Sequence, residues 1–67
     1  MSQKNKMIRA MLSKPICSED LFGTFALFAN GVLSFDDVLN QAHKECVDFK
    51  ALVERENLDY EAISRGE

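Results

Sequence analysis

An apolar seam over residues 34–56 constrains the fold of this chain more than any other feature. Ser34 is a favourable helix N-cap, and Asp37 stands where the acid of a capping box lies. After this start, apolar side chains recur at spacings of 4, 3, 4, 3 and 4 residues, at Phe35, Leu39, Ala42, Cys46, Phe49 and Val53. A seam of this period lies along another helix. We therefore expect one long helix over about residues 35–56, packed against a second helical surface.

Two shorter helices are predicted before the seam. Residues 4–13 place Met7, Ile8, Met11 and Leu12 on one side of an amphipathic helix. Pro15 disfavours helical angles at the preceding residue, so this helix ends before it. Ser18 then caps a second helix over residues 19–29, which is apolar nearly all round because Leu27 falls opposite its main apolar arc. A helix of this kind is expected to be covered from more than one direction.

The predicted fold is a single all-α domain over residues 1–67, a small bundle of three helices with a short C-terminal helical turn at 60–65. A chain of this size buries only about 60% of the surface that it exposes when unfolded. One long and one short amphipathic helix can cover most of the apolar surface of residues 19–29, but the side that bears Gly23 and Leu27 still needs a cover, so we expect a homodimer. Its predicted interface consists of Gly23, Leu27, Leu39, Cys46, Phe49 and Val53.

Composition favours a cytoplasmic protein. The two cysteines, Cys17 and Cys46, are too few for the disulfide framework of a small secreted domain, and the N-terminus lacks the pattern of a secretion signal. The longest apolar stretch, residues 21–29, is far shorter than the roughly 20 residues of a membrane span. No membrane association is expected.

Charge divides the chain into a basic start and an acidic remainder. Residues 1–14 carry four cations and no acid, whereas residues 15–67 carry 11 acids against four cations, so that +4 and −7 give the net charge of −3. Such asymmetry steers association with a charged surface. The predicted partner-binding residues are Lys6, Arg9, Met11, Asp37, Gln41, Lys44 and Asp48.

Motifs for metal or catalysis are incomplete. Residues 30–37 resemble the second half of an EF-hand calcium loop, but Ala26 and Phe28 fall at the first ligand positions and have no side-chain oxygen. His43 and Cys46 lie three residues apart, yet zinc needs three or four ligands, and no oxyanion donor set accompanies this pair. We expect neither a metal, nor a cofactor, nor an enzyme activity.

The function expected from these patterns is that of a small non-enzymatic interaction protein, which binds another protein and regulates or inhibits it, as small phage or mobile-element modulators do. The alternative is a DNA-binding regulator, in which residues 19–29 and the following helix form a helix-turn-helix. Asp36 and Asp37 oppose that alternative, because they would face phosphate charge at the start of the recognition helix. A permanent structural subunit is a third possibility.

Overall fold

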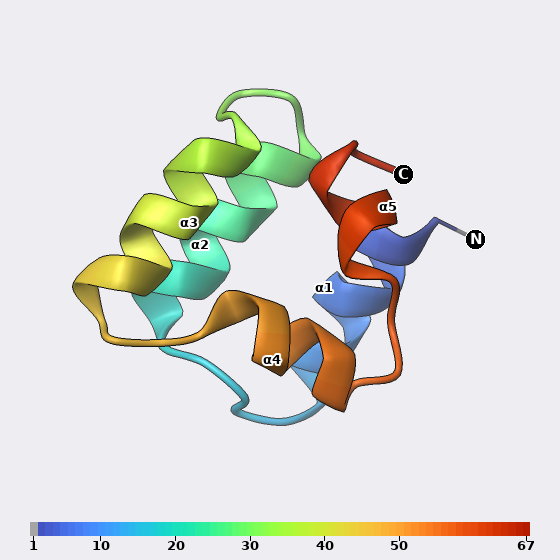
Figure 1. Cartoon of the computed structure of the whole chain (residues 1–67), viewed down its shortest axis with the longest axis horizontal. Coiled ribbons are helices and arrows are strands. Elements are labelled where there is room, and N and C mark those ends of the chain that lie inside the picture. Colours follow the sequence, from blue (N-terminus) through green and yellow to red (C-terminus); the bar gives the residue numbers. More distant parts are fainter. Residues whose placement is uncertain (1) are drawn as a thin grey trace.

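Residues 2–67 of the computed structural model form five helices and no strands (Figure 1). The helices α2 and α3 lie side by side, α4 runs beneath them, and α5 lies against α1, so the two ends of the chain are close together (Figure 1). The amide of Lys4 donates a 2.9 Å hydrogen bond to the carbonyl of Glu67, which fixes this closure. The bounds are α1 Gln3–Ser13, α2 Glu19–Ala29, α3 Phe35–Lys44, α4 Phe49–Arg55 and α5 Tyr60–Ser64.

The helix starts follow the predicted caps. The Ser18 hydroxyl accepts a hydrogen bond from the amide of Leu21, and α2 has the predicted bounds. Ser34 and Asp37 form a complete capping box at the start of α3. These contacts satisfy amides that a helix leaves without partners, so the starts are fixed locally by sequence.

The predicted long helix over residues 35–56 is wrong, because the chain breaks between α3 and α4. Cys46 has φ +57, a left-handed conformation in which an α-helix does not continue. The amides of Cys46 and Val47 donate to carbonyls of the last turn of α3, and Asp48 then caps α4. Cys46 is consequently exposed and does not lie on a buried seam. The all-helical class holds, but five helices replace the predicted three.

The two turns that join the last three helices share one sequence pattern and one backbone conformation. The residues ECVDFKAL at 45–52 and ENLDYEAI at 56–63 match in pattern, and Asn57, like Cys46, has a positive φ of 60. In each corner a left-handed residue is followed by an aliphatic side chain, an Asp N-cap and an aromatic residue. The sequence thus specifies the same turn twice, at an interval of one short helix.

Aromatic side chains join the helices at the centre of the molecule. Phe35, Phe49 and Tyr60 are each the first residue of a helix. The ring of Phe35 lies 5.9 Å from that of Phe49 and 5.5 Å from that of Tyr60, between centroids, and α2 adds Phe25 and Phe28 to the same cluster. Edge-to-face contacts at such distances stabilise a core beyond simple burial. The C-terminal turn packs onto the core, since Ile63 is fully buried.

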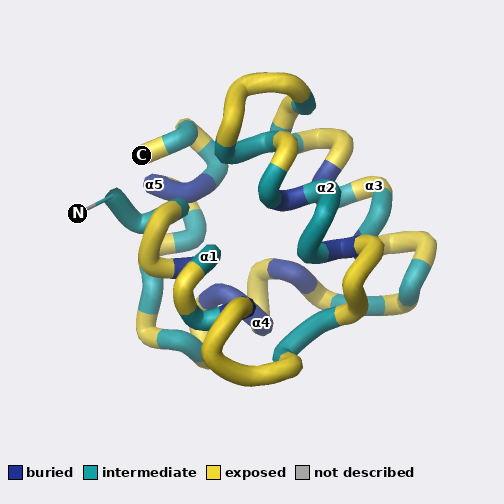
Figure 2. The backbone as a smooth tube through the Cα atoms, turned by 180° about the vertical axis from the view of Figure 1, so that it is seen from behind, coloured by how far each residue is buried: buried dark blue, intermediate teal, exposed yellow. Residues whose placement is uncertain are grey.

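One copy of the chain covers most of its own core. Buried segments of all five helices face inward (Figure 2). Met7 and Met11 fill the core from α1, as the sequence indicates. Three large apolar side chains remain exposed, and two of them lie on or just after α2: Leu27 is 44% exposed and Val32 is 66% exposed, while Leu12 in α1 is 69% exposed. Leu12 was expected on the buried side of its helix, and that expectation is wrong.

Candidate functional site: an apolar groove between α1 and α2

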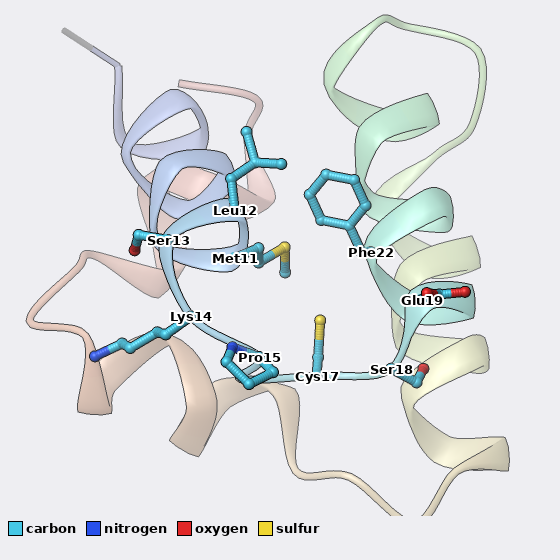
Figure 3. A pocket seen from close by; sticks show the side chains of 9 residues that line it. All are labelled: Met11, Leu12, Ser13, Lys14, Pro15, Cys17, Ser18, Glu19 and Phe22. Atoms are coloured by element: carbon cyan, nitrogen blue, oxygen red, sulfur yellow. The ribbon is translucent and has the colours of Figure 1, made fainter.

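A groove of about 390 Å³ lies where the end of α1 faces the start of α2. Leu12 and Phe22 lie on opposite sides of it, with the side chains of Met11 and Cys17 between them (Figure 3). The side chain of Lys14 points away from it (Figure 3). The complete lining is Met11, Leu12, Ser13, Lys14, Pro15, Cys17, Ser18, Glu19 and Phe22. Apolar side chains converge in this hollow and leave it open to solvent on one side.

The groove exists because the chain breaks and turns at Pro15. Lys14 is extended, with φ −156 and ψ 152, as expected for a residue that precedes proline. The connection at 14–18 therefore crosses from one helix to the next as extended backbone and forms one end of the groove (Figure 3). Leu12, on one wall of the groove, is 69% exposed.

Two carboxylates hold this connection in place. The Lys14 ammonium lies 3.2 Å from a carboxylate oxygen of Glu56, whose side chain is only 11% exposed. At the other end, the Ser18 hydroxyl donates a 2.6 Å hydrogen bond to Glu45, and the Gln41 amide donates a second one. These two hydrogen bonds lower the pKa of Glu45. Both ends of the connection at 14–18 are thus anchored to residues from the second half of the chain.

The Cys17 thiol belongs to the groove and is unsuited to nucleophilic chemistry. Burial raises its pKa, and the negative charge of Glu45 adds to that effect. A thiol with a raised pKa is mostly protonated at neutral pH and behaves as a small apolar group. Cys17 therefore contributes surface to the groove. Both cysteines of the chain are free.

A second hollow, more polar than the groove, lies between the outer sides of α2 and α3. Three of the predicted partner-binding residues line it, namely Asp37, Gln41 and Lys44. Thr24, Leu33, Asn40 and His43 complete its lining. Since α3 presents these residues at intervals of three and four, they share one face of that helix. The structure therefore brings together the α3 part of the predicted surface.

The other predicted partner-binding residues are dispersed. Lys6 and Arg9 are exposed on α1, while Met11 is 8% exposed and contributes to the groove from below. Asp48 caps α4, and its carboxylate accepts a hydrogen bond from the backbone amide of Ala51. No single surface collects all seven residues.

The predicted dimer residues fall into two groups. Phe49 and Val53 are buried within one chain, and Leu39 packs partly against that core, so little of these three is available to a second copy. Gly23 and Leu27 lie on the outer side of α2, where a Cβ added to Gly23 would have nothing within 4 Å. The open face of α2 therefore continues beyond Phe22. Cys46, the sixth residue, lies at the exposed corner after α3.

Metal ligands do not cluster in the described part of the chain. Across residues 2–67, no group of three or more His, Cys, Asp or Glu side chains is placed to hold a metal ion. Nor is any helix formed by these residues long and apolar enough to cross a membrane. Comparison of the chain with protein-family models, curated proteins and solved structures gives no significant match. The groove must therefore be interpreted from its own geometry.

Sequence reasoning did not find the groove because its two walls lie ten residues apart on different helices. Helical periodicity puts Leu12 with Met7 and Met11, but Leu12 lies about 100 degrees round the helix from Met11. With Phe22 it borders the hollow between the helices. The break at Pro15 was the available signal, since it brings the end of one helix next to the start of the other.

Proposed function

We propose that this protein is a small non-enzymatic interaction protein, which binds another protein through the groove between α1 and α2 and thereby regulates or inhibits it. The observation that carries the proposal is the exposed side chain of Leu12 beside an open apolar groove. Exposing apolar surface in this way is unfavourable in water, and grouped exposure of this kind marks interaction sites.

The shape of the groove suits an amphipathic helix or a short apolar segment of a partner. Its sides are set by two helices, and its apolar lining includes a methionine, whose flexible side chain adapts to different shapes. Arg9 lies one helical turn from Leu12, and Glu19 lies at the groove itself. A partner segment with apolar anchors and charges of both signs would therefore complement it.

The proposal is tested by retention of a partner on immobilised variants. Leu12→Glu places a charge in the groove wall, whereas Val32→Glu makes the same change at a residue that is equally exposed and lies outside the groove. We expect wild type and Val32→Glu to retain the same protein from host extract, and Leu12→Glu to lose it. Equal retention by all three, or by none, would contradict the binding of a partner protein in the groove.

The homodimer predicted from the sequence stays a proposal. Its original basis was that three helices could not cover the core, and the two additional helices supply much of that cover. Its basis in the structure is the open face of α2 and the groove next to it.

No observation favours the DNA-binding alternative. In a helix-turn-helix the two helices cross steeply, whereas α2 and α3 lie side by side (Figures 1 and 2). Asp36 and Asp37 are also exposed at the start of α3. A shift of defined duplex DNA by the purified chain, lost at raised salt, would reverse this preference.

A further inference from the structure

We propose that the groove of one copy is occupied by Leu12 of a second copy, in a two-fold homodimer. This inference rests on the proposed function, since it assigns an occupant to the same groove. Leu12 is 69% exposed on one wall of the groove, and its side chain leans toward Phe22 on the other wall, so an exposed apolar side chain and an open hollow lie next to each other in one chain (Figure 3). A two-fold axis beside them places each exposed side chain over the hollow of the other copy.

The charges beside the groove support a second copy as its occupant. Helix α1 carries cations and no acid, whereas α2 carries two acids and no cation. Arg9 precedes Leu12 by three residues, and Glu19 precedes Phe22 by three residues, so each charge lies on the same side of its helix as the apolar residue of that wall. The two ion pairs that residues 2–67 form involve neither Arg9 nor Glu19.

A two-fold arrangement makes these opposite charges complementary. When Leu12 of one copy enters the groove of the other, its α1 faces the partner copy's α2, and a cationic wall therefore meets an acidic wall. The axis repeats this contact, so every dimer contains two such charge pairs and two buried leucines. The outer side of α2 at Gly23 and Leu27 then continues the contact surface, because a Cβ added at Gly23 would meet no atom within 4 Å and Leu27 is 44% exposed.

The dimer would compete with the proposed partner, because one groove cannot hold both. At high concentration the protein would mask its own binding surface, and dilution would expose it. A partner would then bind the monomer and draw the equilibrium away from the dimer.

The experiment is sedimentation of charge-reversed variants, alone and mixed. Arg9→Glu and Glu19→Arg each turn two attractive contacts into repulsive ones, so each alone is expected to raise the dimer dissociation constant by about tenfold or more. In a 1:1 mixture of the two variants, every contact across the axis is again between opposite charges. We expect wild type and the mixture to sediment as reversible dimers at tens of micromolar, and each single variant to sediment as a monomer.

Thermal unfolding of each variant shows whether it is folded before its sedimentation is compared with that of wild type. A dimer that re-forms when the two variants are mixed shows that neither variant was monomeric because of a folding defect. A monomeric wild type, or a mixture that associates no better than its components, would overturn the dimer. A monomeric wild type whose partner retention still depends on Leu12 would leave the proposed function intact. A dimer restored by mixing, together with partner retention insensitive to Leu12→Glu, would contradict the function alone.

Discussion

The corner at Cys46 gives the sharpest test of the fold, because a glycine substitution there raises the stability of a broken helix and lowers that of a continuous one. The sequence predicts a helix through this position, whereas the structure has Cys46 at φ +57 between α3 and α4. Cys46→Gly removes the conflict between a Cβ and left-handed backbone. Cys46→Ala is the reference, since it removes the thiol and retains the Cβ.

The magnitude follows from backbone terms, because the Cys46 side chain is exposed and contributes little burial. A residue with a Cβ costs about 1–2 kcal/mol in the left-handed region. Glycine avoids this cost because it has no Cβ, but it destabilises the folded state by about 0.5–1 kcal/mol through its greater freedom in the unfolded chain. The middle values of these ranges leave Cys46→Gly more stable than Cys46→Ala by about 0.75 kcal/mol, and their extremes bracket this difference at about 0 and 1.5 kcal/mol. For a domain of this size, about 0.75 kcal/mol raises the melting temperature by about 3–6 °C.

Thermal unfolding of the two variants by circular dichroism measures this difference. In a continuous helix, glycine would instead be about 1 kcal/mol less stable than alanine. Cys46→Gly melting below Cys46→Ala would therefore refute the corner. Asn57→Gly serves as an internal comparison at φ +60, and we expect a smaller gain there because asparagine tolerates this conformation.

Three further predictions concern the core, the acid response and the open face of α2. Phe35→Ala should cost about 3 kcal/mol in urea unfolding and Phe35→Leu much less, since the ring contacts three other aromatic rings; equal small losses would contradict the cluster. Hydrogen bonds from Ser18 and Gln41 lower the pKa of Glu45 below its ordinary 4.5, so the stabilisation that this carboxylate provides is complete above pH 4.5 and disappears as the pH falls through the lower native value. Glu45→Gln should therefore flatten the fall in unfolding free energy over this acid range. An unchanged fall in stability at acid pH would argue against those hydrogen bonds. Gly23→Ala should stabilise the monomer by up to about 1 kcal/mol, because the added Cβ meets no atom within 4 Å, and a loss of stability would indicate that this face is covered.

Local sequence signals predicted the helix starts but not the break in the seam. Ser18 and Ser34 form hydrogen bonds to amides three residues away, so their capping roles can be predicted without knowledge of the fold. The break at 46–48 was missed because the seam spacing continues through it and cysteine is an unusual residue for left-handed backbone. The second corner, at 57–59, carries the signal that would have revealed this break, since Cys46, Val47 and Asp48 precede its matching residues by 11 positions. No repeat is recognised unless the two corners are aligned.

The candidate site was less predictable because it depends on packing between distant segments. Charge indicated Lys6 and Arg9, and both are exposed. The exposure of Leu12 depends on how α1 is rotated against the other helices, and the position of the connection at 14–18 depends on Glu45 and Glu56. Neither relation leaves a local pattern in the sequence.

The groove as the contact surface between two copies is tested most directly by amide NMR spectra of the wild-type protein over a dilution series. A dimer formed through the groove predicts concentration-dependent shifts concentrated there, on Leu12, Cys17, Glu19 and Phe22, with α4 and α5 unaffected. Spectra that do not change with concentration, or shifts that gather on the outer side of α3, would contradict it.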